Sequence, residues 1–463
     1  MDDSRDAAVS PSTRRRDRIC STRRAALVAS LCLAATSAAW RSAGAQRIDT
    51  ASVLGALRDA SSACAGDAGA LWSRSLCGPI AFVDRQTRLA VVNDSVASRA
   101  LLPYGGAFVT TLPASVGLAN TSFEWDGRQW AMILLPLPAD RFDRIALVMH
   151  EVFHREQRAL GLSGSDPANN HLDEREGRRW LRLELNALAA ALDALAARGD
   201  ARRHAESAML FRQRRQLLFP NADSLEAALE MQEGLAEYTG DRMAMALTGE
   251  SAARVARRVR DFQATPSYVR SFAYGTGPAL GLLLDEFRPA WRTELPTIRN
   301  PARLLATALG VRASRDLASI AERRALAYGG NEIAAQERVR DSVRSAATAD
   351  YRRRLVDGPV LTVRQTNLNR NFNPNALVGF DAASTVYPTG SFSADWGALE
   401  VTERGALVSN DFTWIRVSAP PSVPAATDHV VKGDGWTLTL KPGWVVRPSH
   451  PERGSLEVVK EQP

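Results

Sequence analysis

The chain has 463 residues, enough for two or three domains, and 58 Lys and Arg residues outnumber 51 Asp and Glu residues for a net charge of +7. Residues 1–45 contain eight Arg and four Asp, so this segment accounts for +4 of the excess and the rest of the chain for only +3. The remaining basic residues are interleaved with acidic ones, which speaks against a nucleic-acid-binding protein. No long apolar span follows residue 45, so we expect no membrane span in the mature chain.

The first 45 residues have the features of a cleavable export signal. Several arginines between Arg14 and Arg24 precede an apolar run from Ala25 to Trp40, and Ala43-Gly44-Ala45 is a suitable cleavage site. Thr22-Arg23-Arg24 also resembles a twin-arginine signal, although the usual Phe and Lys are missing. We therefore expect a periplasmic or secreted protein. The alternatives are an uncleaved anchor and a disordered basic tail.

Cysteine usage agrees with export. Cys20 and Cys32 fall in the expected signal, so the mature chain retains only Cys64 and Cys77. These two residues could form a disulfide in an oxidising compartment. Two buried free thiols are the alternative.

Residues 46–139 are predicted to form a small α+β region. Short apolar runs at 80–83 and 89–92 are separated by Gly and Pro turns. The run Trp130–Leu135 ends at Pro136, and we expect it to be an edge strand against which a substrate backbone pairs. An ordinary core strand is the alternative.

Residues 140–350 are rich in Ala, Leu, Arg and Glu and are predicted to be helical. Within them, His150-Glu151-Val152-Phe153-His154 has the histidine spacing of a zinc hydrolase helix. Residues four apart lie above one another on a helix, so both imidazoles can reach one cation, and Glu151 can take a proton from metal-bound water. Asp140 is a suitable N-cap, with Asp143 in the first turn. Two partly exposed histidines on a surface helix are the alternative.

A catalytic zinc usually has three protein ligands, and we expect the third to be Glu233. Glu237, one helical turn later, could hold a ligand histidine by its other ring nitrogen. Gly234 inside this helix costs about 1 kcal/mol relative to Ala, which suggests a close-packing role. The alternative is a solvated acidic stripe made of four glutamates: Glu226, Glu230, Glu233 and Glu237.

The helix that carries Glu233 is expected to begin with Asp223 or Ser224 as its cap and to end near Leu247. Between the two ligand helices, His171 and Arg178 lie in a segment dense in titratable groups, and both are candidates to shape the cleft. A polar loop that enters a helix is the alternative interpretation of that segment.

Two tyrosines, Tyr268 and Tyr274, precede a leucine-rich helix, and Tyr274 is followed by Gly275-Thr276-Gly277. A neutral phenol can donate a hydrogen bond to the charge that develops on a carbonyl oxygen. The alternative is that both tyrosines pack in the core while the glycines make a turn.

The histidine pair, followed by a Glu-Gly-x-Ala-x-Tyr helix, resembles the gluzincin metallopeptidases, the group of thermolysin and the aminopeptidases related to leukotriene hydrolase. The resemblance covers about residues 140–290. It implies zinc on His150, His154 and Glu233, Glu151 as general base, and Glu237 as the acid behind a ligand histidine. It also implies that Tyr274 stabilises the oxyanion, with Tyr268 as second choice. The Gly-Ala-Met-Glu-Asn segment of the aminopeptidases is absent, which leaves endopeptidase activity or another hydrolysis open.

The composition changes after Asp357-Gly358-Pro359, where alternating strand-like runs begin. Residues 358–463 are therefore predicted to form a β-rich domain, either a sandwich or a barrel. Its aromatic residues could bind a polymer or simply fill a small core.

Together these features predict an α+β protein with a zincin-like helical domain. Two imidazoles and one carboxylate, without thiolates, favour Zn²⁺ as the cofactor. We expect an exported zinc-dependent peptidase that acts on peptides or proteins. The alternatives are an exported scaffold protein that works through its β-rich domain and a zinc hydrolase of non-peptide substrates.

Overall fold

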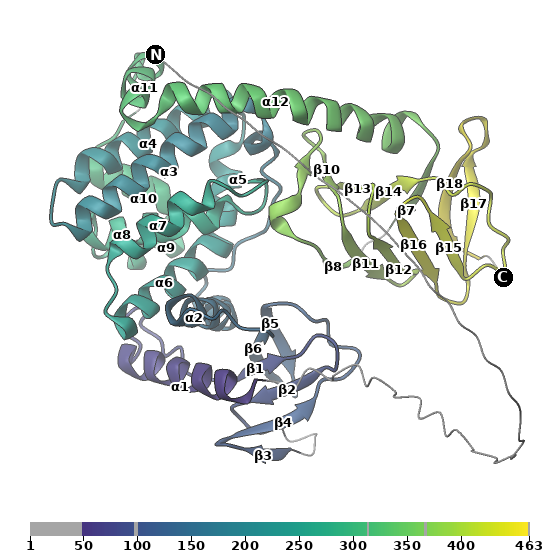
Figure 1. The fold of residues 1–463 in the computed structure, drawn as a ribbon, viewed down its shortest axis with the longest axis horizontal. Coiled ribbons are helices and arrows are strands. Elements are labelled where there is room, and N and C mark those ends of the chain that lie inside the picture. Colours follow the sequence, from purple (N-terminus) through teal and green to yellow (C-terminus); the bar gives the residue numbers. More distant parts are fainter. Residues whose placement is uncertain (1–48, 97–100, 313, 365–367, 462–463) are drawn as a thin grey trace, which may run out of the picture. The chain divides into compact units, whose positions relative to one another are not determined.

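The structure is a computed structural model that describes residues 49–96, 101–312, 314–364 and 368–461. The predicted export signal, residues 1–45, lies outside these described residues. The fold is α+β, with a helical middle and a β-rich C-terminal part, as the composition predicted (Figure 1). No described helix combines the length and the apolar character needed to cross a membrane.

The N-terminal region consists of helix α1 (Thr50–Asp67) and a six-stranded sheet of described residues. The strands are β1 (Ile80–Val83), β2 (Leu89–Val92), β3 (Leu102–Tyr104), β4 (Ala107–Thr111), β5 (Thr121–Trp125) and β6 (Arg128–Leu134). They are ordered β3-β4-β2-β1-β6-β5, with β1 and β6 parallel. A disulfide between Cys64 of α1 and Cys77 ties this helix to the segment that leads into β1.

The edge strand beside the helical body is β5, not the predicted segment Trp130–Leu135. Most of that segment is β6, which lies between β1 and β5. Its apolar side chains from Trp130 to Leu134 are buried, which is typical of a central strand in a sheet covered on both faces. The half-exposed Thr121 and Ser122 and the exposed Glu124 of β5 are instead typical of an open edge. The edge-strand prediction is therefore wrong for Trp130–Leu135, which is a core strand.

The helical body follows directly after β6. Its α-helices are α2 (Arg141–Gln157), α3 (Arg175–Ala196), α4 (Ala201–Leu218), α5 (Ala222–Leu229), α6 (Leu235–Thr248), α7 (Ala252–Phe262), α8 (Phe272–Phe287), α9 (Trp291–Ile298), α10 (Pro301–Leu309), α11 (Leu317–Ala325) and α12 (Gly330–Arg352). Short turns of other helix types are η1 (Asn170–Asp173), η2 (Glu230–Gly234), η3 (Leu326–Tyr328) and η4 (Arg353–Asp357).

The helix starts agree only in part with the sequence signals. The Asp140 carboxylate accepts a hydrogen bond from the Asp143 amide at 3.0 Å, which confirms the predicted cap of α2. By contrast, α5 begins after Asn221, whose backbone is left-handed with a φ of 65°. Asp223 lies inside the first turn and bonds to side chains at the start of α10, and the Ser224 hydroxyl donates to the Asn221 carbonyl. The predicted cap at Asp223 or Ser224 is therefore wrong.

Two close approaches between helices fix α2, α6 and α8 against one another. A Cβ atom added at Gly240 of α6 would lie 2.3 Å from the Ala146 carbonyl oxygen of α2. A Cβ atom added at Gly277 of α8 would lie 2.3 Å from the Gly234 Cα atom. Only glycine allows backbones to come this close. The close-packing role predicted for Gly234 is thus confirmed.

The C-terminal part is a β-sandwich. Its strands are β7 (Val360–Arg364), β8 (Asn369–Asn371), β9 (Val378–Gly379), β10 (Ser384–Tyr387), β11 (Gly390–Ala394), β12 (Gly397–Val401), β13 (Ala406–Ser409), β14 (Trp414–Ser418), β15 (Val430–Gly433), β16 (Trp436–Leu440), β17 (Trp444–His450) and β18 (Ser455–Lys460). One described sheet has the order β17-β18-β7-β14-β13-β10-β9 and the other β15-β16-β12-β11-β8. Apolar residues of both sheets, including Trp436, share one core, so core packing explains this aromatic residue.

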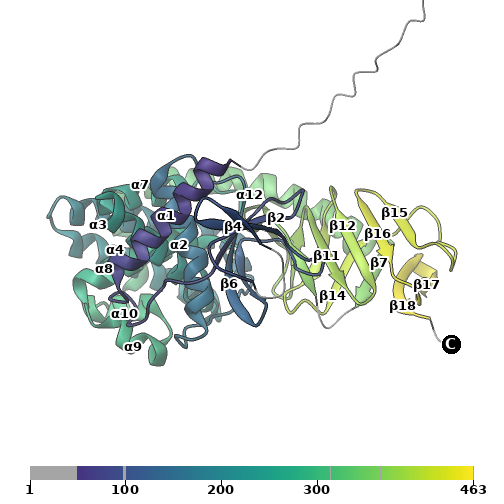
Figure 2. The ribbon, with the colours of Figure 1, turned by 90° about the horizontal axis from the view of Figure 1, so that it is seen from below.

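Polar contacts hold the sandwich against the helical body. The Asn170 side-chain amide donates to the Asp381 and Ser384 carbonyls at 2.7 and 2.8 Å. The Asp173 carboxylate accepts a hydrogen bond from the Gly379 amide at 2.7 Å. These contacts come from η1, and Figures 1 and 2 show the N-terminal sheet next to the β8 and β11 end of the sandwich.

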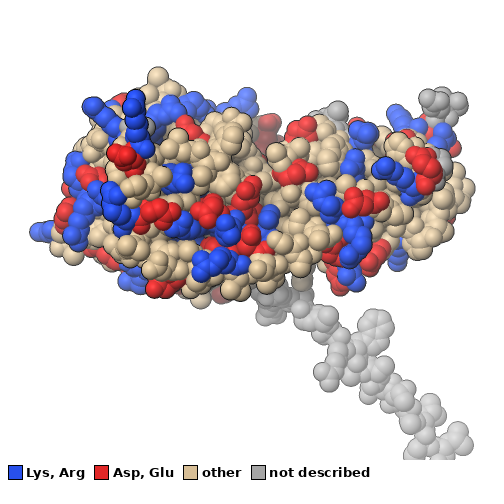
Figure 3. Space-filling model, turned by 90° about the horizontal axis from the view of Figure 1, so that it is seen from above, with Lys and Arg blue, Asp and Glu red and all other residues tan. Residues whose placement is uncertain are grey.

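Charges are mixed on the face drawn in Figure 3. Basic and acidic side chains alternate over both the helical body and the sandwich. Among the described residues of this face there is no continuous basic strip, the usual footprint of a nucleic-acid-binding protein.

Candidate metal centre

Helix α2 presents His150, Glu151 and His154 to the floor of a cleft. The side chains are nearly buried, with His150 5% and Glu151 4% exposed. The two imidazole Nε2 atoms lie 3.0 Å apart. Two such lone pairs facing one another repel unless a proton or a cation lies between them.

Glu233 completes a triangle with the two histidines. Its Oε2 atom lies 3.4 Å from His150 Nε2 and 3.5 Å from His154 Nε2. Two ligands that are each about 2.0–2.1 Å from a tetrahedral ion are about 3.3 Å apart. The three atoms therefore have the spacing of three zinc ligands. Glu151 is also within reach, since its ligand atom and the imidazole nitrogens all lie within 4.8 Å of one another.

The other ring nitrogens are held by acceptors. His150 Nδ1 lies 2.9 Å from Glu237 Oε2, and His154 Nδ1 lies 2.9 Å from Gln157 Oε1. The Gln157 side-chain amide donates to the Met231 carbonyl at 2.8 Å, which leaves its oxygen to accept from His154. Both Nδ1 atoms are then donors, so both Nε2 lone pairs face the site.

Gln157 is a residue that the sequence analysis missed. Its signal was its position three residues after His154, on the same helical face of α2. Arg258 was missed as well, and its guanidinium donates to Glu237 Oε1 at 2.6 Å. No sequence pattern connects α7 with this carboxylate.

Glu233 lies in η2, a π-helical turn between α5 and α6. Such turns insert an extra residue and are frequent at functional sites. Glu230 anchors this turn, because it accepts hydrogen bonds from Arg212 at 2.6 and 2.8 Å and from Thr276 of α8 at 2.6 Å. The orientation of Glu233 thus depends on a buried ion pair next to it.

The interpretation of the four glutamates as a solvated stripe is wrong. Glu226 and Glu230 are fully buried and pair with Arg215 and Arg212 respectively. Burial opposes ionisation of Glu226, but the Arg215 guanidinium outweighs it and holds the pKa of Glu226 far below its ordinary value.

Tyr274 lies in the first turn of α8 and faces the cleft. Its hydroxyl donates to Glu233 Oε2 at 2.8 Å, and its ring stacks on His150 with centroids 5.8 Å apart. Burial and the Glu233 carboxylate raise the pKa of Tyr274 well above its ordinary value, so the phenol keeps its proton. Gly275 and Gly277 are helical residues and do not form the turn considered as an alternative.

Tyr268 does not reach the cleft. Its side chain is fully buried, and its hydroxyl donates to the Gln263 carbonyl at 2.8 Å. Tyr268 is therefore a core residue, and the prediction of a role in the site is wrong.

His171 and Arg178 also lie outside the cleft. His171 Nε2 is 2.8 Å from Glu226 Oε1. Arg178 is fully buried and pairs with Glu337 of α12. Neither residue lines the cavity at the metal site, so the prediction that they shape the cleft is wrong. Arg178 instead belongs to the buried framework around η1 and α3.

The protonation equilibria of the site favour bound positive charge. Burial lowers the pKa of His150, but hydrogen bonds to Glu233 and Glu237 outweigh it, so its pKa lies well above the ordinary value. Burial likewise opposes ionisation of Glu233, yet His154 and His150 hold its pKa well below the ordinary value. For Glu151, burial dominates and raises the pKa. A cation bound between the two imidazoles would interact with the same acceptors, namely the Nε2 atoms of His150 and His154 and the Glu233 carboxylate.

A cavity of about 550 Å³ opens over these residues. Strand β5 and the residue before it contribute Asn120–Ser122 to one wall, and the sandwich contributes Asn371, Phe372 and Pro374 to another. Glu151 lines this cavity, and its Oε2 atom is buried and has no hydrogen-bond partner among the described residues. An unpaired carboxylate oxygen next to three converging ligand atoms is suited to act as a general base that accepts a proton from water.

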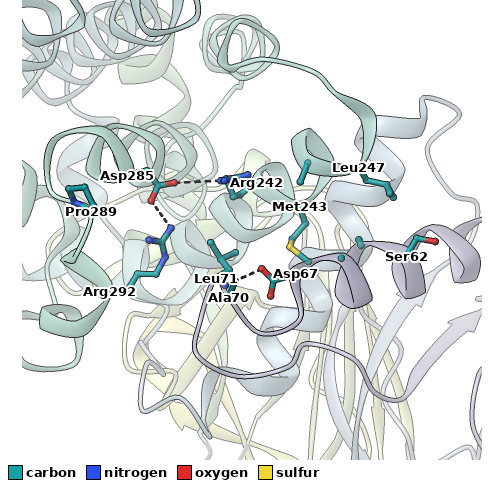
Figure 4. A pocket seen from close by; sticks show the side chains of 13 residues that line it. Ser62, Asp67, Ala70, Leu71, Arg242, Met243, Leu247, Asp285, Pro289 and Arg292 are labelled. Atoms are coloured by element: carbon teal, nitrogen blue, oxygen red, sulfur yellow. Dashed lines mark hydrogen bonds and ion pairs between the residues drawn. The ribbon is translucent and has the colours of Figure 1, made fainter.

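A separate cavity of about 540 Å³ lies between the end of α1, α6 and the start of α9 (Figure 4). Asp285 pairs with Arg292 at 2.5 Å and with Arg242 at 3.7 Å, and the Asp67 carboxylate accepts hydrogen bonds from the Gly69 and Leu71 amides. It contains none of the predicted site residues. The chemistry of this molecule is therefore to be sought in the cleft over α2.

No protein-family model, no curated protein and no solved structure matches this chain. Its function therefore has to be inferred from the side chains of the site.

Proposed function

We propose that this chain is a zinc-dependent hydrolase that cleaves peptide bonds, with a zincin-like catalytic domain of the gluzincin type. The main support is the convergence of His150, His154 and Glu233 at tetrahedral ligand spacing. The Oε2 atom of Glu151, which has no hydrogen-bond partner among the described residues, lies beside them. This arrangement serves catalysis better than structure, because a structural site would use four protein ligands.

The donor set suits Zn²⁺. It combines two imidazoles with one carboxylate, and Cys64 and Cys77 are joined in a disulfide away from it. When bound, zinc would lower the pKa of a coordinated water towards about 7 and polarise the scissile carbonyl.

Within this proposal, Glu151 accepts the proton of the attacking water and passes it to the leaving amine. Burial raises its pKa, which makes its carboxylate a stronger base. Tyr274 turns its hydroxyl from Glu233 to the oxyanion, and its high pKa keeps the proton available for donation. Glu237 and Gln157 hold the two imidazoles in the required orientation.

Peptide substrates are favoured by strand β5. It pairs with β6 on one side only, and its residues Thr121 and Ser122 line the cleft with the metal residues. A free strand edge offers alternating amide and carbonyl groups, which an extended peptide backbone complements. In this proposal the substrate backbone pairs with β5 instead of with Trp130–Leu135.

The test is Glu151→Gln, with the same change at the exposed Glu286 as a control. Glu151→Gln should leave one zinc per chain in elemental analysis and reduce the hydrolysis of a peptide mixture, followed by mass spectrometry, by about 10²–10⁴-fold. Glu286→Gln should behave as the unaltered protein. Normal hydrolysis by Glu151→Gln would refute the mechanism. A purified chain without zinc would favour the scaffold alternative instead.

A further inference from the structure

A second cavity, of about 780 Å³, continues from the proposed catalytic cleft. The two cavities share Ala119, Thr121 and Asn371 as lining residues. The second cavity lies between the N-terminal sheet and the sandwich. We refer to it as the sandwich groove, lined on one side by Ala114–Ala119, Thr121, Phe123 and Glu124 and on the other by Asn369–Asn371, Ser391 and Ser393.

The sandwich wall of this groove is one face of β8 and β11. The register pairs Asn369 with Ser393 and Asn371 with Ser391. Alternate residues of a strand point to one face, so these four side chains lie together. The residue between them on β11, Phe392, is fully buried in the core. This face therefore presents two adjacent pairs of one amide and one hydroxyl side chain.

The groove is lined by charges of both signs, and its two arginines are held by neighbouring groups. The Arg88 guanidinium donates to the Leu112 and Val116 carbonyls at 3.3 and 2.5 Å. Arg370 lies over the Phe412 ring at 3.8 Å, with Asp166 at 3.9 Å. Glu124 of β5 adds an exposed carboxylate, and the other lining groups are neutral donors and acceptors. Such a lining suits the amides of a polypeptide backbone better than a polyanion.

Strand β5 runs along both cavities. Thr121 and Ser122 lie at the metal residues, and Thr121, Phe123 and Glu124 lie in the sandwich groove. From Thr121 to Glu124 an extended strand rises about 10 Å, the length of about three substrate residues. A peptide paired with the free edge of β5 would therefore leave the cleft along the β8 and β11 face.

We propose that the β8 and β11 face is the second wall of the substrate channel and that its ligand is an extended, unfolded polypeptide segment. This inference rests on the proposed function, which supplies the cleavage of a peptide bond. It adds that the sandwich binds part of the substrate. The channel holds about three substrate residues on one side of the scissile bond. We therefore expect the enzyme to prefer long chains over dipeptides.

The first experiment fills the groove. Ser391→Trp and Asn369→Trp place a bulky ring on its wall, and Ser391→Ala removes a hydroxyl without adding bulk. Thr439→Trp is the matched control, because Thr439 is exposed on the same sheet but does not line the groove. The readout is kcat/KM for a peptide of about twelve residues, long enough to span the channel, divided by kcat/KM for a blocked dipeptide.

Both Trp variants in the groove should lower this ratio by about tenfold or more, as expected from the loss of one or two hydrogen bonds and their neighbouring contacts. Ser391→Ala should lower it less, and Thr439→Trp should leave it unchanged. Equal ratios in all variants would overturn the proposal while peptide hydrolysis, and so the proposed function, stands.

The second experiment measures binding without turnover. In the Glu151→Gln background, fluorescence anisotropy of the labelled long peptide should report binding that Ser391→Trp weakens. Binding of this kind without cleavage by the unaltered protein would refute the proposed function and retain the groove. If the peptide does not bind but an N-acetylglucosamine oligomer does, and Ser391→Trp abolishes that binding, the ligand of the groove is a glycan and the peptide assignment is overturned. Binding of neither probe would overturn the proposal as well.

Discussion

Four glutamates at helical spacing divide into two pairs with different surroundings. Glu226 and Glu230 face Arg215 and Arg212, so guanidinium groups take up both carboxylates. Glu233 and Glu237 face imidazoles that keep their Nε2 atoms directed at one point, and the second oxygen of Glu237 accepts a hydrogen bond from Arg258. The first pair is buried framework, and the second lines the cleft. The partner of each carboxylate, rather than its position in the repeat, decides what it can do.

The two pairs of glutamates are also connected through the π-helical turn η2, which contains one residue of each pair. Arg212 and Thr276 hold Glu230 at the start of the π-helical turn, and Glu233 lies near its end. The framework pair therefore orients the candidate ligand without touching it. Mutations that separate stability from metal binding can break or sharpen this comparison.

The largest effect is expected for Arg215→Met. The change removes the buried ion pairs of Arg215 with Glu226 and Glu184, which keep His171 and Arg212 respectively as partners. The loss should lower the free energy of unfolding by about 3–5 kcal/mol. Denaturant unfolding followed by circular dichroism measures this loss. Arg303→Met, which breaks the exposed pair with Asp223, is the control and should cost at most about 1 kcal/mol. Similar losses for the two variants would remove the distinction between buried framework and surface.

Glu233→Gln should act on metal binding instead. Loss of an outer contact to a ligand weakens metal affinity by about 10–100-fold, so loss of a direct ligand should weaken it by more than about 100-fold. Competition with a chromophoric chelator gives the zinc Kd, and Glu286→Gln is the exposed control. An unchanged Kd would show that Glu233 is not a ligand and would end the proposed function.

Local signals in the sequence predicted the parts of the site that lie within one helix. The spacing of His150 and His154 and the cap at Asp140 depend on residues fewer than five positions apart, and α2 forms as expected. Gly234 could be interpreted because glycine inside a helix needs a packing reason, and Gly277 supplies it. Such features follow from helical geometry alone.

Features that depend on tertiary pairing could not be predicted in this way. The apolar run Trp130–Leu135 has the same pattern whether it is an edge or a central strand, and only the neighbours β1 and β5 decide. Tyr268 and Tyr274 have the same chemistry, but one faces Gln263 and the other Glu233. The contribution of Asn371 and Phe372 to the cleft depends on how the sandwich docks, which no local pattern contains.

Glu237→Ala is expected to have an intermediate effect. It removes the acceptor behind His150 Nδ1, which should raise the zinc Kd by about 10–100-fold, or about 1.4–2.7 kcal/mol. Glu237→Gln keeps a carbonyl oxygen that can accept from the imidazole, so it should recover part of the affinity. Isothermal titration of zinc into the metal-free variants distinguishes them. If the Kd of Glu237→Ala equals that of the unaltered protein, Glu237 does not orient the ligand.

The smallest expected effect concerns the acid stability of the framework pair. Arg215 holds the pKa of Glu226 below its ordinary value of 4.5, so the folded state binds the proton more weakly than the unfolded state. The stabilisation is complete above pH 4.5 and is lost as the pH falls below that value, with a slope of at most about 1.4 kcal/mol per pH unit for one proton. In Glu226→Gln this titrating carboxyl is absent, so the free energy of unfolding should decline less steeply between pH 5 and pH 3. The variant is less stable at neutral pH because Arg215 loses its ion pair with Glu226 and keeps only the one with Glu184. Urea unfolding at several pH values measures both slopes. Parallel slopes would mean that Glu226 is not charged in the fold, and the contrast between its guanidinium-paired carboxylate and the imidazole-facing Glu233 would lose its electrostatic basis.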